Sequence, residues 1–389
     1  MSSTAHAPSR VSFFDRLYTG DGGFRIIQHS KLWYGITIAL LVISVVAMLV
    51  RGFDLSIDFE GGTKVSMPAG DLVAEQVETT FEEATGVEAQ LTQIVGAGDS
   101  RVLEINSDQL TEDQAEAARL AIVEAYGASG LGVSEIGVSN VSESWGSTIT
   151  NRMVLSMLVF LVLAGVYVAM RLEKEMAAAA LLALVVDGVV IAGLYALFGL
   201  EVSPAVVIGL LTVLTFSIYD TVVVFDKVRE NTAGVLESRR ATYTEQANLA
   251  VNQTIMRSLS TSVISALPIV ALFVVAVWLL GIGTLRDLAV IQLIGVVEGL
   301  LSSLFLATPL LVTIVTRQRR YRRHTAEVLR YRAAEAGANG AEGASGLADA
   351  GHDEEEETRP DRAKRTVITP RGVHPGSGET ATTWRPNRS

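Results

Sequence analysis

The chain has 389 residues, of which 49% are hydrophobic and 19% are charged, and its mean hydropathy is +0.37. Its apolar residues stand in long runs instead of recurring along one face of a helix or strand, which excludes an ordinary soluble protein. The net charge of -11 argues against nucleic-acid binding by the whole chain. The absence of Cys excludes disulfides, thiolate nucleophiles and cysteine-ligated metals, and the five scattered His offer no metal cluster, so no cofactor is expected.

Six apolar runs are long enough to cross a lipid bilayer. A hydrocarbon core about 30 Å thick needs a helix of roughly 20 apolar residues, each of which rises about 1.5 Å. The first run is too long for a signal peptide, and Arg51 follows it where a cleavage site would stand, so we expect it to remain as an anchor. The predicted spans are 32–50, 153–170, 177–198, 204–225, 259–280 and 288–315.

The positions of Lys and Arg predict the side of the membrane on which each segment lies, because basic residues near span ends favour the cytoplasm. They cluster before the first span, between the second and third, between the fourth and fifth, and after the sixth. Both termini are therefore predicted to be cytoplasmic, in segments 1–31 and 317–389, together with a loop at about 227–257. The opposite side receives residues 51–152, and between 52 and 151 eighteen acidic side chains outnumber three basic ones.

Residues 51–152 are predicted to fold as one extracytoplasmic α+β domain. Short alternating apolar segments predict strands, and apolar residues at helical spacing after a capping residue predict helices. The order βαββαβ predicts a ferredoxin-like layer of helices on an antiparallel sheet. The expected elements are a strand at 55–59 and its return at 64–67, a helix from about Asp71 to Gly86, strands at 89–95 and 101–105, a helix from a Thr111 capping box to Tyr126, and a strand at 133–141.

Two ionisable residues in the spans predict a proton relay. An ionisable side chain at bilayer depth costs about 2.5–3.5 kcal/mol on insertion scales, so each one calls for a reason. Asp220 lies roughly 9 Å inside the cytoplasmic end of the fourth span, and Arg257 begins the fifth span from the same side. The long Arg257 side chain is expected to reach the depth of Asp220 and to form an acid–base pair with it. A static salt bridge between helices, or a structural carboxylate that water satisfies, is the alternative interpretation.

Three further acidic residues are secondary candidates. Asp187 lies well inside the third span and Glu298 inside the sixth, and each is open to a functional or a structural interpretation. Asp226 stands in a cluster of charges at the membrane boundary, which is more typical of an interface than of a relay. Gly295 and Gly299 flank Glu298 at a spacing that favours close helix packing.

Five motifs stand at the boundaries of the predicted spans: DLSIDFEGGT at 54–63, SIYDTVVVFDKVREN at 217–231, NQTIMRSLST at 252–261, GTLRD at 283–287 and SSLFLATP at 302–309. In their order and positions they resemble the motifs of the SecF family, the six-span membrane subunits of the bacterial SecD-SecF protein-translocation accessory complex, within the RND superfamily. The similarity covers roughly residues 53–311. Glu298 departs from it, because an apolar residue is expected at that position.

The resemblance implies a subunit that is not an enzyme and that helps to pull exported preproteins across the cytoplasmic membrane of a bacterium with the proton-motive force. It implies that Asp220 and Arg257 belong to the proton relay, since they match the fourth-span Asp and the fifth-span Arg of the family. Six spans are half of an RND-type transporter. The expected partners are therefore a SecD-like subunit, the SecYEG channel, translocating preproteins and the lipid bilayer, with no nucleic acid.

Two other functions stay open at this point. One is half of an RND-type proton-coupled small-molecule exporter, although such exporters normally carry twelve spans and two large extracytoplasmic domains in one chain. The other is a structural membrane scaffold, in which neutralising Asp220 or Arg257 would have little effect. After the last span, an acidic run at 353–357 within a Pro-, Gly- and Ala-rich stretch from about 333 predicts a disordered tail.

Overall fold

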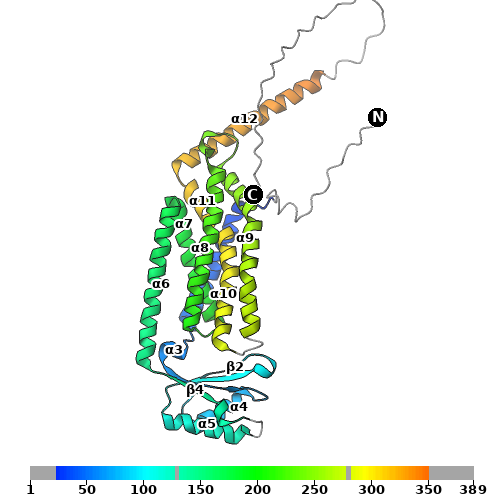
Figure 1. The fold of residues 1–389 in the computed structure, drawn as a ribbon. Helices are drawn as coiled ribbons and strands as arrows, with labels where there is room; N and C mark the ends of the chain where they lie inside the picture. Colours follow the sequence, from blue (N-terminus) through cyan, green and yellow to red (C-terminus); the bar gives the residue numbers. More distant parts are fainter. Residues whose placement is uncertain (1–22, 128–130, 277–281, 350–389) are drawn as a thin grey trace, which may run out of the picture. The chain divides into compact units, whose positions relative to one another are not determined.

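The computed structural model describes residues 23–127, 131–276 and 282–349 (Figure 1). Within them, six helices are long and apolar enough to cross a membrane, which confirms the multi-pass helical fold class. Met1–Arg332 forms one compact unit and Ala333–Ser389 a second. The spanning helices are α2 (Ser30–Val50), α6 (Glu143–Arg171), α7 (Lys174–Phe198), α8 (Pro204–Thr232), α9 (Tyr243–Phe273) and α10 (Gly283–Ser302), which continues through the π-helical turn η7 (Ser303–Ala307) into α11 (Thr308–Thr316).

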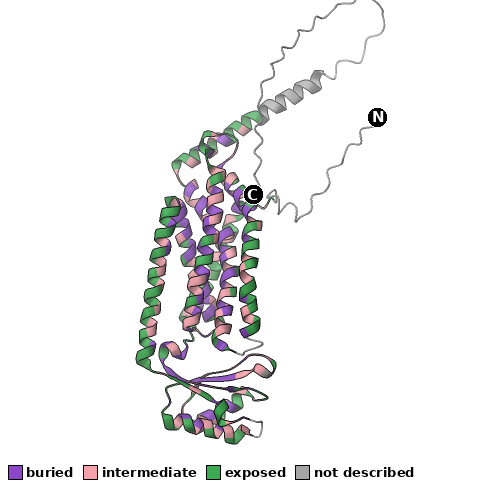
Figure 2. Cartoon of the chain, in the orientation of Figure 1, coloured by how far each residue is buried: buried purple, intermediate pink, exposed green. Residues whose placement is uncertain are grey.

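Helices α7, α8 and α10 form the centre of the bundle, and α2, α6 and α9 lie around them. In the most apolar stretch of α7, 50% of the residues are buried, and 44% are buried in α8 and in the α10–α11 span, against 11% in each of the other three. Helix α6 is exposed along most of its length (Figure 2). Exposed apolar surface of this extent suits a bilayer or another membrane protein.

Helices α8 and α9 extend beyond the predicted spans, so the loop expected at 227–257 is mostly helical. The length of an apolar run marks the part of a helix that lies in hydrocarbon, and polar contacts continue the helix past it. On the polar part of α9, the side-chain amides of Asn248 and Asn252 donate hydrogen bonds to the carbonyl oxygen of Phe24 (2.8 and 2.9 Å). The predicted end of the fifth span, 277–280, lies outside the described residues.

A four-stranded antiparallel sheet with two helices on one face forms the α+β domain. Its strand order, β2-β3-β1-β4, is that of a ferredoxin-like fold, as predicted. Alternate strand residues such as Val65 and Ile105 are buried against Phe81 and Ile122 of the helices. The elements are β1 (Gly62–Pro68), α4 (Ala74–Thr85), β2 (Ala89–Val95), β3 (Val102–Ser107), α5 (Glu112–Tyr126) and β4 (Gly137–Val141).

The strand predicted at 55–59 is wrong. Ile57–Glu60 forms the short helix α3, and Leu55 makes a single parallel bridge with Val202 in the loop before α8. Ile57 and Phe59 are both buried, so two inward-facing residues of one helical turn produce the alternation that resembles a strand. The domain therefore begins at β1, and α3 belongs to its connection with the bundle.

The turn after α3 packs tightly against the start of α6. Gly61 has a φ of +85°, and a Cβ added there would lie 2.8 Å from the backbone nitrogen of Glu143. A Cβ on Gly146 would lie 2.4 Å from the carbonyl oxygen of Phe59. Only glycine permits approaches this close. Because β4 leads directly through the capping residue Ser142 into α6, this end of α6 is held by the domain.

The start of α4 and the start of the last strand differ most from the predicted boundaries, and the ends of β1 and β3 differ by one or two residues. Helix α4 begins after Val73 instead of after Asp71, because a turn closed by the Leu72 amide and the Ala69 carbonyl (2.7 Å) occupies the predicted start. The last strand is shorter than 133–141, since its first residues form a 3-10 turn before β4. The Thr111 capping box of α5 is present as predicted.

Helix α12 (Arg319–Asp349) runs into the segment that was expected to be disordered from about 333. This part of the sequence is rich in Ala, which has the highest helix propensity, and that preference accounts for the continued helix. Residues 350–389, which include the acidic run at 353–357, lie outside the described residues.

Candidate functional site

Asp187 lies at the centre of the bundle on α7, where it is 1% exposed. Its two carboxylate oxygens accept hydrogen bonds from the hydroxyls of Ser217 on α8 (2.5 Å) and Ser302 at the end of α10. A buried carboxylate is costly unless hydrogen bonds satisfy it, and the two hydroxyls supply them. Asp187 thereby joins the three central helices.

Asp220 on α8 faces α9 and the sixth span. Ser258 of α9 donates a hydrogen bond to one of its oxygens (2.7 Å), and Ser303 of η7 donates to the other. A cavity of about 30 Å³ borders the carboxylate and is lined in part by Thr261 and Ser262 of α9. A cavity of this volume has room for about one water molecule, and the hydroxyls and the carboxylate in its walls can bind it, so the geometry allows water to reach Asp220.

Ser302 and Ser303 serve two different carboxylates although they are consecutive in the chain. Successive side chains of a helix point about 100° apart, so Ser302 reaches Asp187 on α7 while Ser303 reaches Asp220 on α8. They stand where α10 passes into the π-helical turn η7, a feature that is frequent at functional sites. The hydroxyl of Thr308 donates to the carbonyl oxygen of Ser303 (3.0 Å) and satisfies a backbone group in the widened turn.

Glu298 lies one turn before Ser302 on α10, and its carboxyl group interacts with that of Asp187. Its Oε2 atom is buried and has no hydrogen-bond partner. The pair is not a metal site, because nowhere in the described ranges do three or more Asp, Glu or His side chains gather around one point. The structure thus places both secondary candidates of the spans, Asp187 and Glu298, in the bundle interior.

Arg257 does not form the predicted pair with Asp220. Its side chain is exposed on α9 and has no ion-pair partner among the described residues. The physical reason is rotational: Ser258 occupies the face of α9 toward Asp220, and the preceding residue therefore points about 100° away. The part of Arg257 in a proton relay stays a prediction.

Asp226 lies in an ion-pair cluster at one end of the bundle. Its carboxylate pairs with Arg171 at the end of α6 (2.7 Å) and with Arg229 one turn later on α8 (3.1 Å). All three side chains are partly exposed, and such pairs contribute about 0–1 kcal/mol each. Asp226 thus holds the end of α6 against α8, the arrangement expected of an interfacial charge.

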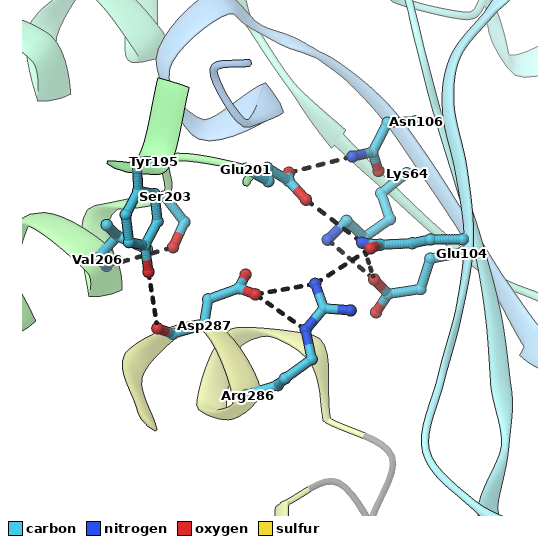
Figure 3. Close-up of polar contacts among 10 residues, drawn as sticks. Lys64, Glu104, Asn106, Tyr195, Glu201, Ser203, Val206, Arg286 and Asp287 are labelled. Atoms are coloured by element: carbon cyan, nitrogen blue, oxygen red, sulfur yellow. Dashed lines mark hydrogen bonds and ion pairs between the residues drawn. The ribbon is translucent and has the colours of Figure 1, made fainter. Parts of the chain in front are cut away.

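A second polar cluster joins the α+β domain to the opposite end of the bundle (Figure 3). Arg286 near the start of α10 donates to Oε1 of Gln93 on β2 (3.1 Å) and pairs with Asp287 (2.9 Å). Gln93 and Asn106 donate to Glu201 in the α7–α8 loop (3.4 and 3.2 Å). These residues lie on the sheet face opposite α4 and α5. The docking cluster consists of Lys64, Gln93, Glu104, Asn106, Glu201, Arg286 and Asp287.

The buried carboxyl group of Glu201 is expected to make this docking cluster sensitive to pH. Burial raises the pKa of Glu201 above its ordinary value, while the positive charge of Lys64 acts in the opposite direction. When the domain separates, Glu201 regains water and its ordinary pKa. A carboxyl whose pKa is raised in the docked state favours docking below its ordinary pKa and loses that contribution as the pH rises through the raised value.

We therefore expect docking to weaken as the pH rises from acid toward neutral, and Glu201→Gln to reduce that dependence, because burial also raises the pKa of Asp287 in the same cluster. Because the chain contains no Cys, spin labels can be placed at Glu83→Cys on α4 and Leu197→Cys on α7, and their distance distribution followed against pH. Glu124→Gln, an exposed change on α5, is the matched control. An unchanged pH dependence in Glu201→Gln would contradict the assignment.

Several residues of both clusters escape prediction from the sequence. Ser217 and Ser303 donate hydrogen bonds to the buried carboxylates, but a serine within an apolar span does not by itself indicate such a role. Both serines nevertheless lie inside the motifs at 217–231 and 302–309. Glu201 stands in a short turn between two spans, where a carboxylate is unremarkable until the sheet covers it. The position of these motifs at the ends of spans is the feature of the sequence that could have pointed to these residues.

Residues 124–317 match the family described as "Protein export membrane protein SecD/SecF, C-terminal", and residues 46–70 match the "SecD/SecF GG Motif". Over 320 residues, 81% of this chain and 72% of the relative, the sequence is 49% identical to protein translocase subunit SecF of Mycobacterium tuberculosis (strain ATCC 25618 / H37Rv). The chain belongs to the SecF family. Protein translocase subunit SecF of Streptomyces coelicolor is 37% identical over 76% of this chain and 78% of that protein.

The same similarity extends to a solved structure. The crystal structure of SecDF from Thermus thermophilus, described as a translocon-associated membrane protein, superposes with a TM-score of 0.64 at 29% identity. The match covers 76% of this chain and 39% of that one, so the chain spans about two fifths of SecDF. The SecD/SecF C-terminal match contains the carboxylates and serines of the bundle interior described above, and the GG motif match contains the turn that packs against α6.

Proposed function

We propose that this SecF-family chain assists late preprotein translocation across the cytoplasmic membrane and is driven by the proton-motive force, with Asp220 as the group that takes up and releases the proton. Its relatives are named protein translocase subunits, which supports protein export over small-molecule efflux. In this proposal both termini are cytoplasmic and the acidic α+β domain lies on the other side of the membrane.

The observation that carries the proposal is the environment of Asp220. Two serine hydroxyls donate hydrogen bonds to its carboxylate, no cation neutralises it within the described part of the chain, and a cavity lined in part by hydroxyls borders it. A carboxylate at bilayer depth with these neighbours can exchange a proton with water, whereas a permanently paired carboxylate cannot do so without breaking its ion pair.

The energy available is sufficient for a movement of helices. One elementary charge that crosses the membrane potential is worth about 2.3 kcal/mol per 100 mV. A shift of packed helices between two arrangements needs a bias of a few kcal/mol, so a few protons per cycle suffice. The docking cluster would carry such a movement from the start of α10 to the α+β domain, because Arg286 of α10 contacts Gln93 of the sheet.

A SecD-like subunit is the proposed partner within the membrane, with the SecYEG channel adjacent and preproteins as the cargo. Exposed apolar surface on α2, α6 and α9 supports a membrane-embedded neighbour. Arg257 adds a second argument: it lies beside Ser258, and therefore near the depth of Asp220, yet it is exposed on the single chain. A guanidinium at that depth is stabilised when a neighbouring span covers it, and there it can serve the relay.

A tagged chain, extracted from membranes in mild detergent, is expected to purify with a SecD-like subunit in equal amount and with the channel in smaller amount. Mass spectrometry identifies and counts the partners. Asp220→Asn should retain the same partners, because the amide preserves the shape of the side chain. Purification of the chain without either partner would contradict the proposed assembly, and would favour a scaffold or an independent exporter.

A further inference from the structure

Glu298 and Asp187 form a pair of carboxyl groups in the bundle interior, distinct from Asp220. Asp187 on α7 and Glu298 on α10 are close enough for the charge of each carboxyl group to act on the other. Two buried carboxylates at one place repel each other when both are ionised, so their placement favours a proton on one of them. Neither group has an ion-pair partner in the described ranges, which leaves the proton as the group that balances their charge.

A cavity of about 140 Å³, separate from the one beside Asp220, borders Glu298, and its walls are apolar except at Glu298, Ser302, Thr37 and the indole nitrogen of Trp33. It lies between α2, α7, α10 and η7, and both Glu298 and Trp33 line it. The Oε2 atom of Glu298 and the indole Nε1 of Trp33 are buried without hydrogen-bond partners. An acceptor and a donor on one cavity of this volume suit water molecules, which can deliver a proton to Glu298 and remove it.

The charged and titratable groups around the pair are few. Helix α8 contributes Asp220, and α9 contributes Arg257, which is exposed. Helix α2 contributes Tyr34, whose hydroxyl is hydrogen-bonded to Thr313 (2.8 Å). Of these groups, Asp220 is the one whose protonation can affect the pair through hydrogen bonds that the structure shows.

That connection is the turn that carries Ser302 and Ser303. One hydroxyl donates to Asp187 and the next donates to Asp220, and the backbone between them is a single peptide at the start of η7. We infer that Asp187 and Glu298 form a second proton-binding site, and that Ser302 and Ser303 couple its protonation to that of Asp220. This inference rests on the proposed function of Asp220 and extends it to a second carboxyl pair.

The coupled step involves only proton transfer. A proton from water in the larger cavity binds an oxygen of Glu298, and no other covalent bond changes. When Asp220 takes up a proton, its oxygens accept the Ser303 hydroxyl more weakly, so the turn is free to move. The same movement changes the hydrogen bond from Ser302 to Asp187 and with it the proton affinity of the pair. The two sites therefore titrate as linked groups.

Infrared spectroscopy of the full-length chain with its partner in lipid nanodiscs tests the coupling, because each protonated carboxyl group gives a C=O band. Glu298→Gln is expected to remove one titrating band that Asp220→Asn leaves in place. Asp220→Asn should shift the half-protonation pH of the remaining band by about one pH unit. In Ser303→Ala the same Asp220→Asn change should cause no such shift.

Ser262→Ala is the matched control, because Ser262 lines the cavity beside Asp220 without contacting either carboxylate. It should leave the shift unchanged, and Ser303→Thr, which keeps the hydroxyl, should restore it. If Asp220→Asn does not move the second band, or if the shift survives in Ser303→Ala, the coupling is refuted. If Glu298→Gln assembles poorly, Ser302→Ala provides the second test, since it should also abolish the shift.

The outcomes separate this inference from the proposed function. Normal proton-driven translocation by Asp220→Asn would overturn the function of Asp220, whatever the infrared bands show. Loss of translocation in Asp220→Asn together with an unshifted second band would leave that function in place and overturn only the coupled site.

Discussion

Replacing Asp220 by Asn is expected to lower translocation to the rate measured without a proton gradient and to leave the assembled complex intact. The amide keeps the shape of the carboxylate, and its oxygen still accepts hydrogen bonds from Ser258 or Ser303. It takes up no proton at neutral pH, so the energy of the gradient no longer reaches the helices. The measurement is late-stage translocation into proteoliposomes of defined internal and external pH, compared with and without the gradient.

The control for this variant is Asp226→Asn. It removes a carboxylate from the same helix, but one that lies in partly exposed ion pairs with Arg171 and Arg229, so we expect at most a small change in rate. Arg257→Ala in the same assay should resemble Asp220→Asn if the arginine serves the relay. Gradient-driven translocation at the normal rate in Asp220→Asn would eliminate the proton-relay assignment, and a lower amount of Arg257→Ala protein alone would make Arg257 structural.

The second large effect is expected from Gly193→Val on α7. A Cβ at this position would lie 2.0 Å from the Cβ and 2.4 Å from the Cα of Ser44 on α2. Because a backbone atom is involved, rotation of a side chain cannot relieve the overlap, and the two helices must separate. Overpacking typically costs about 1–3 kcal/mol, and separation of α2 from the bundle places this variant at or above the upper end.

Thermal unfolding of the purified protein in detergent measures this effect. Gly193→Val should lower the unfolding midpoint by several degrees, and disulfide cross-linking between Cys residues introduced on α2 and α7 should fall with it. Gly188→Ala provides the control on the same helix, because its Cβ would meet the nearest atom, Cδ1 of Leu214, at an ordinary 4.0 Å. Equal stability of the two variants would show that α2 packs on α7 differently from this structure.

Much of the fold can be predicted from sequence patterns that each reflect a single physical property. Bilayer thickness determines the length of an apolar run, so all six spans are predictable, and alternation with capping residues predicts most of the α+β domain. The errors arise where a contact distant in sequence decides the local structure. The segment around Ile57 alternates like a strand but forms a helical turn. The bridge between Leu55 and Val202 and the burial of Ile57 and Phe59 stabilise that turn.

The candidate site divides in the same way. The cost of burying a charge makes Asp187, Asp220 and Glu298 conspicuous in the sequence, and the structure places all three in or beside the bundle interior. The partner of Asp220 was not predictable, because Arg257 and Ser258 are adjacent on α9 and the rotation of the helix decides which of them faces Asp220. Helix rotation depends on the packing of the whole bundle, and span length and charge carry no information about it.

Helix α6 is attached mainly at its two ends. At one end the glycine turn and β4 hold it to the α+β domain, and at the other Arg171 pairs with Asp226 of α8, while the surface between is largely exposed. Its 29 residues span about 43 Å. A rod fixed in this way would transmit a tilt of the domain along its full length. A rotation of the domain by about 10° would move the far end by roughly 7 Å, more than one helical turn, and would pull directly on the ion pair beside the last turn of α8.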